Sequence, residues 1–163
     1  MTDPAHWHRR PGGATGGRIV IFDIDGVLSD ARPRQHHLID GTPDWHAFFS
    51  EGINDEPLTA GVALARVTAL PIVMVSARPS YVHHDSVAWL EREGVPFDLV
   101  VTRPAGDGST SSEFKAAELA ALQEAGYEVT LAVDDDPSNV AMYHDHGVEA
   151  LYIHSGYYDI EIG

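Results

Sequence analysis

Short apolar runs alternate with helix-like segments along this chain, and no other feature constrains its fold as strongly. Strands are expected at 18–22, 71–76, 97–102, 128–133 and 149–154. Helices are expected between them, at 57–70, 80–94, 111–126 and 137–147. Most of these strands are apolar throughout, which is typical of a parallel sheet that is covered on both faces. The pattern therefore predicts an α/β fold, a doubly wound parallel sheet with the first strand central.

The remaining segments lie outside this alternation. Residues 1–17 are polar and rich in glycine, and we expect them to form a flexible tail. Residues 18–163 are expected to form a single domain, because a chain of 163 residues suits one domain and no linker divides it. The irregular segment 30–56 follows the first strand directly, and we expect it to form a small cap.

Composition narrows the possible functions. The chain has no cysteine, which excludes a disulfide framework and a cysteine-based zinc site. No apolar run approaches the roughly 18 residues of a membrane span, and no secretory signal is visible, so a cytoplasmic protein is expected. The net charge of −15 disfavours broad contact with a nucleic-acid backbone. It leaves room for a local phosphate-bearing substrate, because a bound cation can reverse the field inside a site.

Polar side chains follow the ends of the first four predicted strands. In open α/β sheets, ligands bind beyond the carboxyl ends of the strands, so we expect these groups to converge on one edge. The chain's only lysine opens the helix after the third strand and is expected at the same edge. The candidate groups are Asp23, Asp25, Ser76, Arg78, Arg103, Lys115, Asp134 and Asp135.

Several carboxylates at one edge repel each other unless a cation holds them. Mg²⁺ prefers oxygen ligands from carboxylates, carbonyls and water. With such a cation, Asp23 can attack phosphorus as a nucleophile, and Asp25 can protonate the leaving oxygen and later deprotonate water. Ser76 and Lys115 can stabilise the negative charge of the phosphoryl group. The residues therefore predict phosphoryl transfer supported by magnesium.

Four motifs carry a family resemblance. The stretches "FDIDGVLSD", "VMVSARP", "SSEFKAAEL" and "VDDDPSNV" resemble, in this order, the motifs of the haloacid dehalogenase (HAD) superfamily of phosphotransferases. The resemblance implies that Asp23 is the nucleophile, which forms an aspartyl-phosphate, and that Asp25 is the acid and base. It implies that Ser76 and Lys115 bind the substrate phosphate. The implied Mg²⁺ ligands are Asp23, the Asp25 carbonyl and Asp134, supported by Asp135.

A narrower resemblance lies in "TPDWHAFF", "SARP", "VVTRPAGD" and "DDDPSNVAMYHDHG". These stretches are similar to the 3′-phosphatase domain of phage polynucleotide kinases, in which two arginines assist the substrate phosphate. The matching residues here are Arg78 and Arg103. The favoured function is thus a magnesium-dependent phosphomonoesterase acting on a nucleotide or a nucleic-acid 3′-phosphate. The alternative is a HAD phosphatase that acts on a small phosphorylated metabolite.

Several other interpretations of these motifs are weaker. A signalling receiver domain would need a phospho-accepting aspartate after the third strand, and no suitable aspartate follows "FDLVV". Zinc binding by histidine pairs is disfavoured because neither His83-His84 nor His144-x-His146 shares a helix face. The segment "DWHAFF" is interpreted as hydrophobic packing of the cap rather than as a base-stacking platform.

Asp136 is expected to cap the helix that begins at Pro137.

Overall fold

A six-stranded sheet forms the centre of the molecule in the computed structural model, which describes residues 2–158. Its strand order is β1-β4-β3-β2-β5-β6. Strands β4, β3, β2, β5 and β6 are parallel, and β1 is antiparallel to β4. The strands are β1 (Trp7–Arg9), β2 (Gly17–Phe22), β3 (Ile72–Pro79), β4 (Leu99–Arg103), β5 (Tyr127–Asp134) and β6 (Ala150–Tyr152). The predicted α/β sheet is confirmed, with β2 in its interior.

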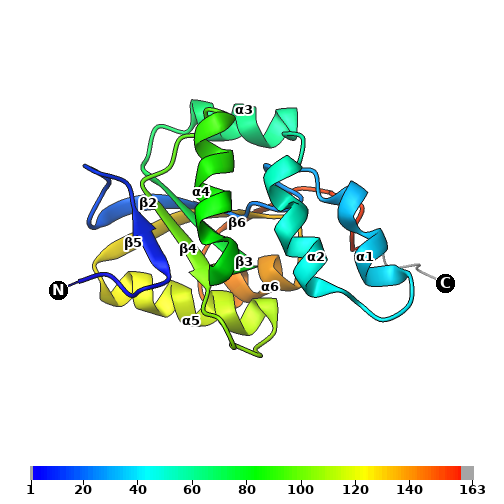
Figure 1. The fold of residues 1–163 in the computed structure, drawn as a ribbon. Coiled ribbons are helices and arrows are strands. Elements are labelled where there is room, and N and C mark those ends of the chain that lie inside the picture. Colours follow the sequence, from blue (N-terminus) through cyan, green and yellow to red (C-terminus); the bar gives the residue numbers. More distant parts are fainter. Residues whose placement is uncertain (1, 159–163) are drawn as a thin grey trace.

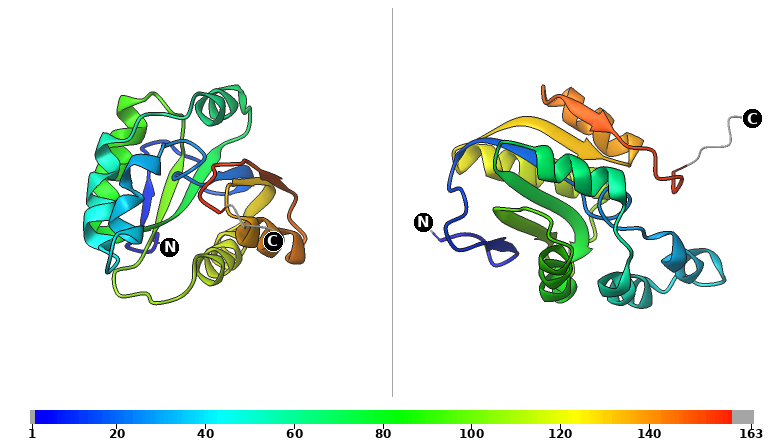
Figure 2. Two further views of the ribbon diagram at one scale, coloured as in Figure 1. Left: turned by 90° about the vertical axis from the view of Figure 1, so that its right-hand side faces the viewer. Right: turned by 90° about the horizontal axis from the view of Figure 1, so that it is seen from above.

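Helices cover both faces of the sheet (Figures 1 and 2). Helices α3 (Thr59–Val67) and α4 (His83–Arg92) contribute to one hydrophobic cluster, which contains Trp89. Helices α5 (Ser111–Glu124) and α6 (Pro137–Asp145) contribute to the other cluster. Because side chains alternate along a strand, Phe22 of β2 lies in the first cluster and Ile21 in the second. Burial on both faces explains why the last four residues of β2, 19–22, are all apolar.

Local capping fixes where the two helices beside the site begin. Thr110 and Glu113 form a capping box at the start of α5, in which each side chain bonds the other residue's backbone N–H. Asp136 caps α6 by accepting a hydrogen bond from the backbone N–H of Ser138 at 2.8 Å. The predicted capping role of Asp136 is confirmed. Helix α6 thus begins shortly after β5 ends at Asp134, whereas residues 104–110 separate the start of α5 from the end of β4.

The segment that links β2 to α3 forms several short helical turns. These are η1 (Arg32–Arg34), α1 (His36–Ile39), α2 (Trp45–Ser50) and η2 (Glu51–Asn54). A further short turn, η3 (Ser80–Val82), precedes α4. Helices α1 and α2 lie to one side of the sheet, near the C-terminal end of the described chain (Figure 1). We call residues 30–56 the cap segment.

The N-terminal residues correct one expectation. Residues 1–17 were expected to be a flexible tail, but Trp7–Arg9 form β1 and pair with β4. The Trp7 side chain is buried, and its Nε1–H donates to the Glu118 carboxylate at 2.7 Å. The polar composition of residues 1–17 gives no indication of this strand, which covers the otherwise unpaired edge of β4. None of the described helices is long and apolar enough to cross a membrane.

We predict that Trp7→Ala lowers the free energy of unfolding by about 3 kcal/mol, because it removes a buried aromatic side chain and its hydrogen bond. Urea denaturation measures this change. Trp45→Ala is the matched control, since Trp45 is 55% exposed and its removal leaves no core cavity. Equal, small losses in both variants would show that the N-terminal segment does not belong to the stable fold.

Candidate active site

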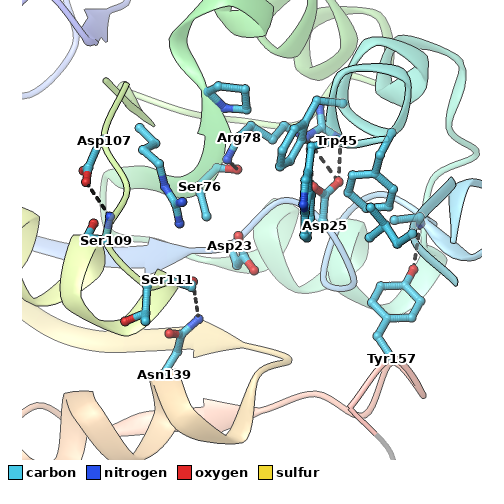
Figure 3. Close-up of a pocket in the computed structure, with 18 of the residues that line it drawn as sticks. Asp23, Asp25, Trp45, Ser76, Arg78, Asp107, Ser109, Ser111, Asn139 and Tyr157 are labelled. Carbon is cyan, nitrogen blue, oxygen red and sulfur yellow. Dashed lines mark hydrogen bonds and ion pairs between the residues drawn. The ribbon is translucent and has the colours of Figure 1, made fainter. Parts of the chain in front are cut away.

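A cavity of about 610 Å³ lies where the carboxyl ends of β2, β3 and β4 meet the cap segment. In Figure 3, Asp23 and Ser76 lie near its centre, with Asp107, Ser109 and Ser111 to one side and Asp25 and Trp45 to the other. Of the candidate residues predicted from sequence, the lining includes Asp23, Asp25, Ser76, Arg78 and Arg103. The structure therefore brings these strand-end groups together, as the topology predicts.

Three buried carboxylates form an acidic cluster at the edge of this cavity. One oxygen from each of Asp23, Asp134 and Asp135 lies within 4.8 Å of the other two. Burial and the neighbouring Asp134 and Asp135 raise the pKa of Asp23 well above its usual value. Burial and Asp134 likewise raise the pKa of Asp135, to about 7. Crowded acids of this kind are stabilised by a divalent cation.

The donor atoms of the acidic cluster fit a hard metal ion. All three groups offer carboxylate oxygens, the ligands that Mg²⁺ prefers. Oδ2 of Asp135 is buried and has no hydrogen-bond partner, which is costly for a carboxylate unless a cation satisfies it. The Asp25 carboxylate is not a member of this cluster. Its predicted metal ligand is the backbone carbonyl, and that assignment stays a prediction.

Lys115 links two members of the acidic cluster. Its Nζ donates to Oδ2 of Asp134 at 2.6 Å and lies 3.3 Å from Oδ1 of Asp23. Burial opposes the charge of this ammonium, but the two carboxylates outweigh burial and raise the pKa of Lys115 well above its usual value. Asn139 also donates to both oxygens of Asp134, at 3.2 Å. The lysine therefore stays charged within reach of the candidate nucleophile.

Asp25 lies in a different electrostatic environment from Asp23. Its Oδ1 accepts hydrogen bonds from Nη2 of Arg34 at 2.7 Å and from Nη2 of Arg78 at 2.6 Å. Ser29 donates to the same oxygen at 3.0 Å. Burial opposes ionisation of Asp25, but the two guanidinium groups outweigh it and lower the pKa of this carboxyl below its usual value. Asp25 is therefore held as a carboxylate in this structure.

The two guanidinium groups also share a second carboxylate, Asp55. Arg34 donates to both oxygens of Asp55, at 2.7 and 2.6 Å, in a bidentate arrangement. Nη2 of Arg78 lies 3.4 Å from the same residue. We call Asp25, Arg34, Asp55 and Arg78 the arginine network. It connects the cap segment, which supplies Arg34 and Asp55, to the ends of β2 and β3.

The predicted phosphate ligands differ in the protein groups that they contact. Ser76 is buried beside Asp23, and its Oγ accepts from the backbone N–H of Arg78 at 3.2 Å. Arg103 lies over the ring of Phe114, with its Nε buried and without a hydrogen-bond partner. Arg78 instead bonds chiefly to Asp25. The phosphate contacts assigned to these residues stay predictions.

Gly26 allows the acidic cluster to assemble. Its φ of +80° lies in the left-handed region, which favours glycine. A Cβ at this position would come within 2.0 Å of Oδ2 of Asp135. The glycine that follows Asp25 in the sequence is therefore required for β2 and β5 to present their carboxylates side by side.

Residues 17–158 match the protein family described as "Polynucleotide kinase PNKP phosphatase domain". The chain belongs to this family. The match begins at β2 and extends beyond β6, so it includes the acidic cluster and the arginine network. This polynucleotide kinase phosphatase domain is accordingly a HAD-type phosphatase, a phosphoric monoester hydrolase, and the resemblance seen in its sequence motifs is confirmed.

Solved structures share this fold. A chain of the Pnkp1/Rnl/Hen1 RNA repair complex aligns with a TM-score of 0.69 and 19% identity, over 86% of this chain and 43% of that one. A further Pnkp1/Rnl/Hen1 structure aligns with a TM-score of 0.71 and 18% identity, over 98% of this chain and 52% of that one. The class C acid phosphatase from Bacillus anthracis aligns with a TM-score of 0.60 and 16% identity, over 91% and 70% of the two chains.

The phosphatase domain described here therefore spans about half the length of the RNA repair chains that it matches. No curated protein sequence matches the chain closely enough to count as a relative. The structural likenesses show the fold, whereas the family match identifies the kind of enzyme.

Sequence reasoning missed three residues of this phosphatase site. Arg34 and Asp55 fall in the irregular cap segment, where no periodic pattern indicates what a side chain contacts. Asn139 lies within the fourth motif, but an asparagine in the first turn of a helix does not by itself indicate a contact with Asp134. A usable signal existed for Arg34, because an arginine between short turns and close to Asp25 in sequence can reach that carboxylate. The spacing between Asp55 and Asp25 gave no such signal.

We predict that Arg34→Met lowers the free energy of unfolding by about 3 kcal/mol or more, because it leaves the buried Asp55 carboxylate without its bidentate partner. Adding Asp55→Asn to that variant should restore part of the loss, and urea denaturation measures both. Arg32→Met is the matched control, since Arg32 forms an exposed pair with Asp30 and its loss should change the free energy of unfolding little. Similar losses in Arg32→Met and Arg34→Met would contradict the prediction.

Proposed function

We propose that this chain is a magnesium-dependent phosphomonoesterase that removes a 3′-phosphate from a nucleotide or a nucleic-acid end. The observation that carries the proposal is the placement of Asp23 between a charged lysine and two further carboxylates, at the edge of a cavity of about 610 Å³. Ligand pockets of roughly 300–1,000 Å³ accommodate whole small molecules, so this one has room for more than a phosphate group.

The metal would be held by Asp23, Asp134 and Asp135, together with the Asp25 carbonyl implied by the family resemblance. When bound, Mg²⁺ would supply positive charge that neutralises these carboxylates and the phosphoryl oxygens. Lys115 adds a fixed ammonium beside Asp23. Together these charges allow an anionic nucleophile to approach an anionic phosphate, which simple repulsion would otherwise prevent.

In the first step, an oxygen of Asp23 attacks phosphorus and the bond from phosphorus to the 3′-oxygen breaks. The leaving 3′-oxygen takes a proton from Asp25, so that a free 3′-hydroxyl and an aspartyl-phosphate on Asp23 result. The negative charge of the arriving substrate favours protonation of Asp25, against the two arginines that hold it ionised in the free enzyme.

In the second step, Asp25 accepts a proton from water while the water oxygen attacks phosphorus. The bond between phosphorus and Asp23 then breaks, which releases inorganic phosphate and regenerates the Asp23 carboxylate. The carboxylate form of Asp25 held by Arg34 and Arg78 is the form that this step requires. The network also fixes the position of Asp25, since donors from three residues meet at its Oδ1.

The phosphoryl group would be bound by Ser76 and Lys115 close to Asp23, and by Arg103 from the end of β4. The unpartnered Nε of Arg103 supports this role, because a buried guanidinium donor without a protein partner is available to a ligand. Arg78 would contribute mainly through Asp25 and secondarily through the phosphate. The cytoplasmic location expected from the sequence stays a prediction.

The alternative substrate is a small phosphorylated metabolite. The net charge of −15 favours substrates with few phosphates, since a long polyanion gains little from an acidic surface. A mononucleotide or a short 3′-phosphorylated end satisfies this constraint as well as a sugar phosphate does. The family match favours the nucleotide.

We predict that the protein hydrolyses nucleoside 3′-monophosphates and 3′-phosphorylated oligonucleotides faster than their 5′-phosphorylated isomers or sugar phosphates. Release of inorganic phosphate at matched salt concentrations measures each kcat/KM. Asp23→Asn should lose at least three orders of magnitude in rate, because it removes the attacking charge while keeping the side chain's shape.

The control is Asp145→Asn, which makes the same change at an exposed position on α6 and should keep wild-type activity. More than a tenth of wild-type rate in Asp23→Asn would overturn the role of Asp23 as nucleophile. A preference for sugar phosphates over every nucleotide would favour the metabolite phosphatase.

We also predict that activity disappears in EDTA and returns with Mg²⁺, but not with Ca²⁺, whose larger and looser coordination shell alters the geometry. Mg²⁺ should also raise the melting temperature, because it binds the folded cluster only. Asp135→Asn should abolish most of that rise. The matched control is Asp136→Asn, which removes the neighbouring charge but keeps a good helix cap. Full activity in EDTA would overturn the proposed chemistry.

A further inference from the structure

Four of the aromatic side chains that line the cavity lie in α2 or against it: Trp45, Phe48 and Phe49 from α2, and Tyr81 from η3, which stacks on His46 of α2. We call them the aromatic wall. Trp45 is 55% exposed and Tyr81 is 52% exposed, whereas the other two tryptophans, Trp7 and Trp89, are buried. An aromatic group beside a reactive site that leaves about half of its surface exposed in the free protein is well suited to bind a ligand.

The exposed rings of the wall are supported by other rings. Trp45 stacks on Phe49, with centroids 5.8 Å apart and planes 24° apart, and its edge contacts Phe48. Tyr81 stacks on His46, with centroids 5.5 Å apart and planes 19° apart. Such contacts hold each ring in one orientation, so a ligand that stacks there need not order a mobile side chain.

The aromatic wall is also tied to the site's charged groups. The ring of Phe48 lies 4.4 Å from the guanidinium carbon of Arg34, and Arg34 bonds directly to Asp25. Arg34 further donates to the backbone carbonyl of Phe48 at 2.7 Å. The position of α2 is therefore set by the same residue that orients the candidate acid and base. A ligand held by the wall lies at a fixed distance from the reacting groups.

The two sides of the cavity differ in chemistry. Figure 3 shows Asp107, Ser109 and Ser111 on the side opposite Trp45, with Asp23 between the two sides. Arg103 also lines the cavity. Both Nε of Arg103 and Oγ of Ser109 are buried without a hydrogen-bond partner. A ligand that matches this division has a flat apolar part joined to an anionic, hydroxyl-bearing part. A nucleotide has this composition, whereas a sugar phosphate lacks the flat apolar part.

We propose that the aromatic wall binds the nucleobase of the nucleotide whose phosphate reacts at Asp23, with Trp45 as the principal stacking residue. This inference rests on the proposed function and specifies how that site selects its substrate. It revises the interpretation of "DWHAFF" as cap packing, because Phe48 is buried but Trp45 is exposed to the cavity. Stacking uses the π-face that every base has, so it selects nucleotides without selecting one base.

The experiment compares a nucleoside 3′-monophosphate with 1-deoxyribose 3-phosphate, which has the same phosphate but no base. For the wild type, kcat/KM should be higher for the nucleotide by roughly 10-fold or more, the effect of one stacked base. Trp45→Ala should bring this ratio close to one, and Trp45→Phe should restore part of it. Tyr152→Ala is the matched control, because Tyr152 is an exposed aromatic residue on β6 outside this cavity.

A binding measurement gives a second readout that does not depend on turnover. In the Asp23→Asn protein, a nucleoside 3′-monophosphate should quench the fluorescence of exposed Trp45, and the quenching should disappear when Trp45→Phe is added. Melting temperatures establish that each variant is folded.

Two failures are distinguishable. The base-stacking inference alone would be overturned if the wild type hydrolysed nucleoside 3′-monophosphates no faster than the compound without a base. It would also be overturned if Trp45→Ala left the wild-type preference for the nucleotide unchanged. No wild-type turnover of any 3′-phosphorylated nucleotide or oligonucleotide would overturn the proposed function, and this inference with it.

Discussion

The buried Lys115 ammonium is the interaction on which the rest of the site depends. It joins α5 to the ends of β2 and β5 by contacting Asp23 and Asp134 at once. A lysine suits this position because a compact ammonium can sit between two carboxylates, whereas a planar guanidinium would spread them apart. One positive charge among three carboxylates still leaves an excess of negative charge, since Asp135 belongs to the same cluster. The fold therefore assembles a site that a divalent cation completes.

The second constraint is that Asp23 and Asp25, two residues apart, are held in opposite electrostatic environments. Burial among carboxylates raises the pKa of Asp23, whereas paired guanidinium groups lower that of Asp25 despite its burial. Such a divergence in neighbouring acids is typical of sites where one carboxylate reacts and the other transfers protons. The carboxylates around Asp23 come from the end of the sheet, whereas the cap segment supplies Arg34, one of the two guanidinium groups around Asp25. The cap thus has an electrostatic function as well as a steric one.

The sequence predicted those parts of the fold and site that depend on local pattern. The apolar runs that became β2 to β6 alternate with helix-like segments and mostly end in polar groups, and the carboxyl ends of parallel strands must meet at one edge. The pattern could not place Arg34 against Asp25 and Asp55, because those contacts depend on how an aperiodic segment folds back. It also missed β1, since the burial of Trp7 depends on an edge of β4 that exists only after the sheet forms. The missed features are contacts between distant segments, and no helix or strand pattern in the sequence indicates such contacts.

The distribution of charge explains why an aromatic wall accompanies this site. In the part of the chain that the structure describes, Arg34, Arg78 and Lys115 are buried, and each is already paired with a carboxylate of the protein. These carboxylates largely neutralise their charge, which is therefore little available to attract a polyanion, while the molecule as a whole carries −15. Under the proposed function, part of the affinity for the nucleotide would then come from contacts that do not depend on charge. Stacking on Trp45 is such a contact, because its strength comes from apolar area and π-face geometry and survives in an acidic protein.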